Sequence, residues 1–255
     1  MNTEVISLII FGCVVGAVFI GRTVSRLLPA ERLSTDTKDT VKLAMGLLAT
    51  MSALLLGLLV ASTKGSYDNA RNEVIQMAAK VVFLDRVLTG YGPETAETRA
   101  LLREAVEELA HHSMQLPKAN TRVNLAPNTQ AGNAIYLAIQ HLTPQDEMQR
   151  SLKSQATTLA LDLGQLRTLL VAESISSISK PMLIVVGCWL VVIFLGFTVI
   201  APRNATATTA LMISALSAAA AIFLILELDR PFSGVLRISN EPMLNVLNQL
   251  AQRNP

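Results

Sequence analysis

The sequence predicts an all-α integral membrane protein with four transmembrane helices and a helical extramembrane bundle built on extensions of the second and third spans. Hydrophobic residues make up 51% of the 255 residues and charged residues only 16%, which is unusual for a soluble domain. Four uncharged stretches are long enough to cross a bilayer. Between the second and third of them, residues 64–180 carry 12 basic and 12 acidic side chains, which is more than half of all charge.

The four stretches come close to the roughly 20 apolar residues that a bilayer core requires. They run from about Val5 to Gly21, Leu43 to Thr63, Pro181 to Ala201 and Ala205 to Leu226. No basic segment precedes the first stretch and no small-residue cleavage site follows it, so we interpret it as a mature helix. The chain then divides into residues 1–63 with two spans, an extramembrane domain at 64–180, two spans at 181–230 and an interfacial tail at 231–255.

The second span is predicted to continue into the extramembrane domain as one helix. Apolar residues recur at helical spacing after Tyr67, and the pattern stops at the turn sequence Thr89–Pro93. A further helix fits Glu94–Leu116. The Pro, Asn and Thr content of Pro117–Asn133 indicates a loop, and a short helix follows at Ala134–His141.

The last helix of the domain is predicted to begin at Thr143 as N-cap, with Pro144 in its first turn. Its leucines follow spacings of four and three, which is typical of the seam along which helices pair. This seam consists of Leu152, Ala156, Leu159, Leu163, Leu166 and Leu170. Helix propensity continues to Pro181, where the third span begins. No strand alternation or internal repeat is evident.

Basic residues suggest the orientation of the chain. Five of them follow the first span in the short loop to the second: Arg22, Arg26, Arg32, Lys38 and Lys42. Positive-inside bias places this loop and Arg203 in the cytoplasm, and the large domain with both termini outside. Lys64, Arg71, Arg230 and Arg237 lie near span ends on the opposite side, and they leave the reverse orientation open.

Small and hydroxyl side chains line parts of the spans. Ala49, Ala53 and Gly57 recur at every fourth place of the second span, and Ser214 and Ser217 lie in the fourth. Such residues let helices approach closely. In a homo-oligomer they would alternatively line a passive pore.

Motifs for catalysis are missing from the sequence, and no metal or cofactor is predicted. His111 and His112 lie one turn after two glutamates, which fits a solvated helix face at least as well as a metal site. The chain shows no phosphate-binding loop, nucleophile elbow or triad. Cys13 and Cys188 lie inside spans and are expected to be apolar thiols. Nearly balanced charge, 21 basic against 19 acidic residues, gives no reason to expect a nucleic-acid partner. We therefore predict that the protein is not an enzyme.

Two motifs carry a resemblance to a known family. They are GLLVASTKGSYDNARNEVIQMAAKVVFLDRVLTGYGPE at Gly57–Glu94 and LELDRPFSGVLRIS at Leu226–Ser239. Together with the four spans they resemble a family of bacterial integral membrane proteins of unknown function, often labelled bestrophin-like. Since bestrophins are pentameric anion channels, the resemblance implies a bacterial inner-membrane location, self-association and ion conduction. It assigns no individual residue to a pore.

The second motif ends the fourth span. Pro231 and Gly234 are expected to stop the helix, and Glu227, Asp229 and Arg230 lie where headgroups begin. The charges are either solvated at the interface or form part of a pore mouth or ion pairs. An acidic mouth would favour cations, whereas the bestrophin label suggests anions. Beyond Gly234, an amphipathic segment broken at Pro242 is predicted to lie in the interface or to dock on the bundle.

The sequence therefore predicts a homo-oligomeric membrane protein that acts as a passive ion channel. A non-conducting scaffold or sensor that binds a partner through the Leu152–Leu170 seam is the alternative. Candidate pore-mouth residues are Ser62, Lys64, Tyr67 and Asp68 at the exit of the second span, with Glu227, Asp229 and Arg230 at the end of the fourth. The lipid bilayer and ions are the expected partners besides further copies of the chain.

Overall fold

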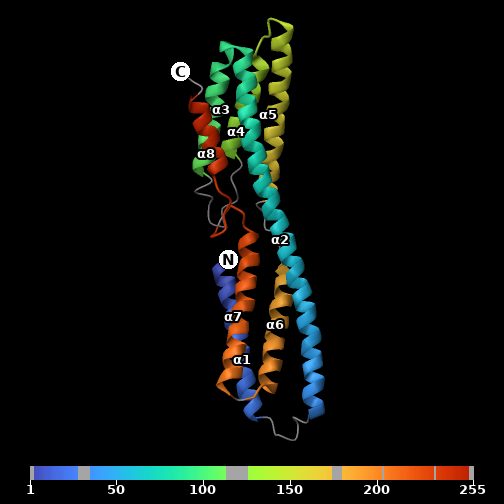
Figure 1. The fold of residues 1–255 in the computed structure, drawn as a ribbon. Coiled ribbons are helices and arrows are strands. Elements are labelled where there is room, and N and C mark those ends of the chain that lie inside the picture. The colour runs from blue at the N-terminus through green and yellow to red at the C-terminus, as the bar shows by residue number, and fades with distance from the viewer. Residues whose placement is uncertain are drawn as a thin grey trace. The chain divides into compact units, whose positions relative to one another are not determined.

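The computed structural model describes residues 3–27, 35–112, 126–173, 180–202, 204–232 and 234–252. The chain forms two compact units. The membrane unit contains residues 1–66 and 177–229, and the helical unit contains residues 67–176 and 230–255. All regular elements in the described parts of the chain are helices (Figure 1).

The membrane unit consists of α1 (Thr3–Leu27), the first part of α2 (Thr35–Tyr91), α6 (Lys180–Ile200) and α7 (Ala205–Leu228). Each contains a window long and apolar enough to span a bilayer, which confirms the four predicted spans. Their shared core contains Val14 and Val18 of α1, Leu59 of α2, Val186 of α6 and Ile222 of α7. Because one core joins all four helices, the spans form a bundle within a single chain.

Helices α1 and α6 approach each other closely at Gly21. A Cβ placed on this residue would lie 2.8 Å from the Thr198 Cβ and 3.1 Å from the Leu195 carbonyl oxygen. Only a residue without a side chain allows the two backbones to come this close. The Thr198 hydroxyl is buried and donates to the Phe194 carbonyl at 2.6 Å, so it adds no unpaired polar group to this contact.

Helix α2 contains 57 residues, against the roughly 20 that a span requires. This confirms the prediction that the second span continues as one unbroken helix well beyond the length of a span. The helix ends at Tyr91, within the turn sequence that predicted its end, and the 3-10 turn η2 (Pro93–Thr95) follows. The Thr95 hydroxyl is 2.7 Å from the Leu88 carbonyl and 2.8 Å from the Gly92 carbonyl, so it stabilises this turn.

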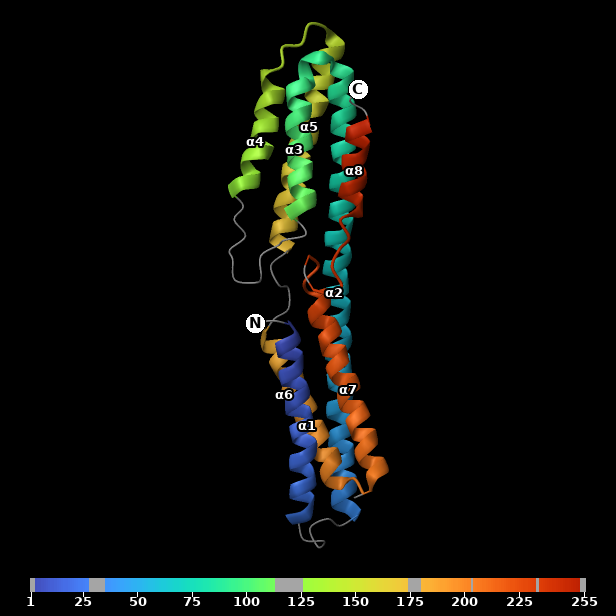
Figure 2. The same cartoon turned by 90° about the vertical axis from the view of Figure 1, so that its left-hand side faces the viewer.

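The helical unit packs α3 (Ala96–His112), α4 (Ala126–His141), α5 (Glu147–Glu173) and α8 (Glu241–Gln252) with the second part of α2 (Figure 2). Its core includes Leu84 and Leu88 of α2, Val106 of α3 and Ile139 of α4, none of which is more than 1% exposed. Asp85 on α2 accepts from the Arg99 Nε on α3 at 2.8 Å, and both side chains are largely buried. The helical unit is thus a bundle, as the apolar periodicity of the sequence predicts.

Two predicted helix boundaries are wrong. Helix α4 begins at Ala126, inside the predicted loop Pro117–Asn133, because Pro127 lies in its first turn, where a missing N–H costs nothing. Helix α5 begins at Glu147 and not near Pro144. Asp146 supplies the cap, since its Oδ1 accepts from the Gln149 N–H at 2.7 Å. The predicted segment 113–116 of α3 lies outside the described residues.

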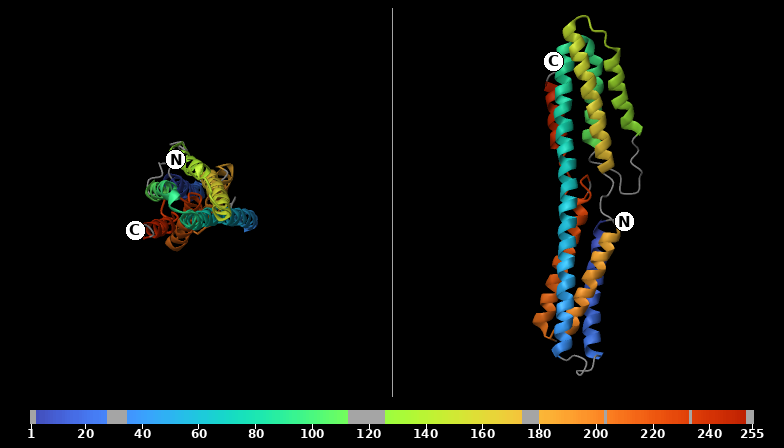
Figure 3. Two further views of the ribbon diagram at one scale, coloured as in Figure 1. Left: turned by 90° about the horizontal axis from the view of Figure 1, so that it is seen from above. Right: turned by 90° about the vertical axis from the view of Figure 1, so that its right-hand side faces the viewer.

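The leucine seam of α5 faces the interior of the helical unit. Ala156 is buried, and Leu152, Leu159, Leu163, Leu166 and Leu170 pack partly buried against the core. The right-hand view of Figure 3 shows α5 running alongside α2. The seam therefore stabilises the unit itself. Residues 174–179, through which α5 was predicted to continue into the third span, lie outside the described residues.

Helix α8 docks on the bundle, one of the two positions that the sequence left open for it. Met243, Val246 and Leu250 are buried in the core of the helical unit. The Arg103 Nη2 on α3 donates to the Leu250 carbonyl at 2.9 Å. Pro242 does not break this helix, because it is the second residue of α8 and needs no N–H there.

Candidate functional site at the polar ends of the spans

Helix α7 ends where the sequence predicts a stop. Its last residue is Leu228, and the Asp229 N–H donates to the Ile225 carbonyl at 3.1 Å. Further on, the Ile238 N–H donates to the Pro231 carbonyl at 2.7 Å, which closes a turn. Gly234 within this turn has a φ of 92°, a conformation that favours glycine. The motif LELDRPFSG thus ends a span and leads the chain into a turn.

The two carboxylates at this end of α7 are buried. Glu227 is 3% exposed and Asp229 is 8% exposed, so the interpretation of Asp229 as a solvated interfacial charge is wrong. Each of the two residues interacts with other groups of the protein. Buried carboxylates are costly unless other groups compensate them, and they commonly mark functional positions in membrane proteins.

The membrane exit of α2 lies at the same end of the membrane unit. Leu59 shares the core with Ile225 and Leu226 of α7, and Thr63 follows one turn later. The buried Thr63 hydroxyl donates to the Leu59 carbonyl at 2.9 Å. Ser62 and Lys64 are exposed on the other faces of α2. This end of the unit therefore combines two buried acids with an exposed hydroxyl and an exposed amine.

Tyr67, Asp68 and Arg230 belong to the helical unit. All three are half-buried, and each interacts with other groups of the protein. A shared role with the acids of α7 stays a prediction.

The small residues that the sequence analysis identified in the spans lie on helix faces that no other helix of the described chain covers fully. Ala53, Gly57, Ser214 and Ser217 are exposed, and Ala49 is half-buried. No atom of another helix would meet a Cβ on Gly57 within 4 Å. The Ser217 hydroxyl donates to the Ile213 carbonyl at 3.0 Å. Their role in packing between copies or in lining a pore stays a prediction.

The opposite end of the membrane unit is basic. The Arg22 Nη1 on α1 donates to the Pro202 carbonyl at 3.0 Å. The Arg22 Nη2 donates to the Thr208 hydroxyl on α7. Lys42 pairs with Asp39 at the start of α2 at 2.8 Å. Arg32 and Arg203 lie outside the described residues. The predicted basic side of the spans thus contains a bond that joins α1 to the connection between α6 and α7.

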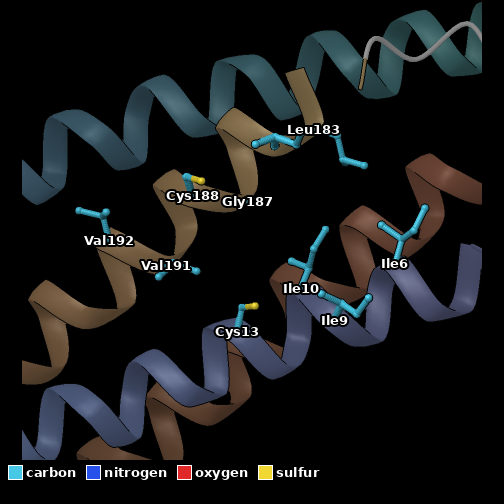
Figure 4. Close-up of a pocket in the computed structure, with 10 residues that line it drawn as sticks. Ile6, Ile9, Ile10, Cys13, Leu183, Gly187, Cys188, Val191 and Val192 are labelled. Carbon is cyan, nitrogen blue, oxygen red and sulfur yellow. The ribbon is translucent and has the colours of Figure 1, made fainter. Parts of the chain in front are cut away.

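A cavity of about 420 Å³ separates α1 from α6 within the membrane unit (Figure 4). Isoleucines of α1 and valines of α6 line it, together with Cys13 and Cys188, whose thiols are both free. Figure 4 shows these cysteines on the facing helices α1 and α6. The lining offers no charged group or hydroxyl, so the cavity has nothing with which to replace the hydration shell of an ion.

Sequence reasoning missed a second cavity, of about 1010 Å³, between α2, α3, α4 and α5 of the helical unit. Arg167 of α5 lines it. Burial lowers the pKa of Arg167, and the nearby charge of Glu108 partly opposes this effect. The sequence offered one sign of this cavity. Arg167 lies directly after Leu166 of the leucine seam, which places a charged residue close to a helix face that is otherwise apolar.

The described residues hold no cluster of histidine, cysteine, aspartate and glutamate that would bind a metal ion. His141 is exposed at the end of α4, and the side chains of His111 and His112 lie outside the described part of the chain.

Comparison with known proteins identifies the family. The Bestrophin-like domain matches residues 12–243, nearly the whole chain. A bacterial bestrophin homologue from Klebsiella pneumoniae with a tryptophan-to-alanine substitution has 15% identity and a TM-score of 0.71, over 99% of this chain and 98% of that chain. The homologue phased by zinc anomalous scattering has 14% identity and a TM-score of 0.65, over 94% of this chain and 99% of that chain. No curated protein sequence matches the chain.

The fold and its four spans define an all-helical integral membrane protein. The chain belongs to the Bestrophin-like domain family.

Proposed function

We propose that the chain is one subunit of a homo-oligomer that conducts ions passively across a bacterial inner membrane. Family membership over residues 12–243 is the observation that carries this proposal. Bestrophin homologues with the same fold add support, although identities of 14–15% carry the fold alone.

The spanning part of α2 is largely exposed within one chain, as expected for a subunit that packs against further copies in an oligomer. Only 11% of its spanning window is buried inside the chain, compared with 28% for α1 and α6 and 22% for α7. The exposed face includes Ala53 and Gly57, which permit close helix approach, and Ser62 at the exit. We propose that α2 faces a neighbouring copy or a central pathway, and that Ser214 and Ser217 of α7 take part in the same assembly.

The buried acids of α7 are the proposed electrostatic element of the pathway. None of the four spans has an ionisable residue near its middle, which argues against a proton relay or an ion-coupled carrier. Glu227 and Asp229 follow the last apolar turn of α7, at the same end of the unit as Lys64. Charge at a pore entrance alters the local concentration of permeant ions.

The alternative of a scaffold that binds partners through the Leu152–Leu170 seam lacks an available surface. The seam residues pack against the core of the helical unit, so a partner would have to displace α2 and α3. For orientation, we propose that the helical unit lies on the periplasmic side, because Arg22, Arg26, Lys38 and Lys42 gather at the opposite end of the spans.

Purified protein in planar bilayers tests the proposed channel. We expect current that depends on protein, and a several-fold change in ion flux or selectivity for Asp229→Asn, which removes charge but keeps shape. Asp39→Asn is the matched control, because Asp39 pairs with Lys42 on the surface at the other end of the unit. Absence of current over a range of salts and voltages would contradict conduction.

The copy number is tested separately, by imaging the protein in nanodiscs along the membrane normal. We expect several copies around an axis. Monomeric particles would contradict the homo-oligomer.

A further inference from the structure

The cavity of the helical unit is large enough to be a ligand site. Its volume of about 1010 Å³ lies at the upper end of the roughly 300–1,000 Å³ typical of small-molecule sites. Protein interiors otherwise leave few voids larger than a water molecule. The cavity lies between four helices of one unit and opens to solvent at Leu161 and Leu169, so a ligand can enter it.

The lining is apolar on two of the helices. Side chains of α2 and α3 contribute only hydrocarbon and thioether surface: Met77, Val81, Leu84, Leu102, Val106 and Leu109. At the edge of the cavity, Leu161 and Leu169 of α5 are 55% and 50% exposed. Apolar side chains that stay half-exposed beside a void indicate a binding surface for hydrocarbon.

The remaining lining is polar and contains a single charge. Asn133 and Tyr136 of α4 and Gln165, Arg167 and Thr168 of α5 contribute polar groups, and Arg167 is the one charged residue of this lining in the described chain. Its guanidinium is half-buried and lies near the charge of Glu108. A planar guanidinium in such a position binds a carboxylate or a phosphate through two parallel hydrogen bonds.

We propose that this cavity binds a single-chain amphiphile with an anionic head group, such as a long-chain fatty acid. Its head pairs with Arg167, and its hydrocarbon chain lies against the apolar side chains of α2 and α3. A small hydrated anion would leave the apolar walls of α2 and α3 uncovered, whereas a hydrocarbon chain covers them. The positive charge favours an acid over a neutral lipid. This inference goes beyond the proposed channel, and its test requires no ion flux.

Binding of dansyl-undecanoic acid to the full-length protein tests the proposal. The protein is kept in nanodiscs without detergent, because a detergent is itself an amphiphile, and empty nanodiscs supply the background. We expect saturable fluorescence above this background. Hexadecanoic acid displaces the probe, whereas hexadecanol, which has the same chain without the charge, displaces it much less.

Two variants separate charge from volume. We expect Arg167→Gln to weaken binding about tenfold, the effect of losing a charge-assisted pair. Ala160→Phe is expected to abolish binding, because it fills the cavity that Ala160 lines. Arg150→Gln is the matched control on the same helix. Arg150 pairs with Glu147 on the surface, so affinity is expected to stay unchanged. Circular dichroism and size-exclusion profiles equal to those of the wild type establish that each variant is folded.

Three results would overturn the proposal. They are probe binding no greater than in empty nanodiscs, equal affinity for folded Arg167→Gln, and equal displacement by the alcohol. A second copy of the chain is the competing occupant. With Cys13 and Cys188 replaced by alanine, rapid and complete disulfide formation between copies of Leu169→Cys would show that a neighbouring subunit covers the cavity, and would also refute ligand binding there.

Discussion

The clearest residue-scale feature outside the cavities is Tyr91, the last residue of α2. Its side chain is 4% exposed, and its hydroxyl has no hydrogen-bond partner among the described residues. Burial raises the pKa of Tyr91 above its usual value, and the charges of Glu94 and Asp146 raise it further. An unpaired buried hydroxyl costs about 1–3 kcal/mol.

We predict that Tyr91→Phe leaves the stability of the helical unit unchanged or raises it near pH 7. A raised pKa means that the folded state resists loss of the Tyr91 proton. The stability contribution is therefore complete below the unfolded pKa of about 10 and is lost as pH rises through the folded pKa. Thermal unfolding followed by circular dichroism at neutral pH and above pH 10 measures both effects. A phenylalanine variant that loses stability at high pH as steeply as the wild type would contradict the assignment.

The packing of α1 on α6 depends on a second residue, Gly21. We predict that Gly21→Ala destabilises the membrane unit by about 1–3 kcal/mol, because the new Cβ would overlap Thr198 and the Leu195 backbone. The matched control is Gly12→Ala on the same helix, where no atom of another helix lies within 4 Å of the new Cβ. Thermal unfolding in detergent compares the two variants. Equal melting temperatures would show that the contact tolerates a methyl group.

At the scale of elements, hydrogen bonds to helix ends hold the helical unit together. The Lys153 Nζ of α5 donates to the Gln140 and Leu142 carbonyls at 2.7 and 2.8 Å, at the end of α4. The Gln149 Nε2 donates to the Tyr91 carbonyl at 3.1 Å, at the end of α2. Last-turn carbonyls have no partner within their own helix, so each bond satisfies an otherwise open group while it joins two elements.

We predict that Arg103→Met releases α8 from the bundle more readily. The variant keeps apolar bulk but loses the bond to the Leu250 carbonyl, and a hydrogen bond of a charged group contributes about 1.5–3 kcal/mol. Hydrogen exchange in residues 241–252 is expected to accelerate more than tenfold, while α4 keeps its protection. Arg150→Met is the control, since Arg150 lies on the surface of α5. Unchanged exchange in α8 would mean that its apolar face alone fixes it.

At the scale of the whole molecule, the distribution of charge predicts the orientation. We expect a membrane-impermeant maleimide to label Ser154→Cys on α5 in intact spheroplasts, and to label Thr37→Cys on α2 only after permeabilisation. Both side chains are exposed, and both variants are made with Cys13 and Cys188 replaced by alanine. The reverse labelling pattern would place the helical unit in the cytoplasm.

Much of the fold follows from local sequence patterns. Four uncharged windows predict the spans, because the length of an apolar stretch is a property of that stretch alone. The continuous α2 follows from unbroken helical periodicity up to Tyr91. Helix starts were less predictable, since Thr143 and Asp146 are both suitable caps and only the bonds around Gln149 select Asp146.

The sequence by itself determined the fold class, the four spans, the end of the fourth span near Leu228 and the motifs of the Bestrophin-like domain. Only the tertiary structure decided that Glu227 and Asp229 are buried, that the α5 seam faces inward, that α8 docks on α3 and that Arg167 lines a cavity. The physical reason is that apolar length and turn chemistry act over a few neighbouring residues. Burial depends on which distant helix covers each side chain, and no local pattern specifies that helix.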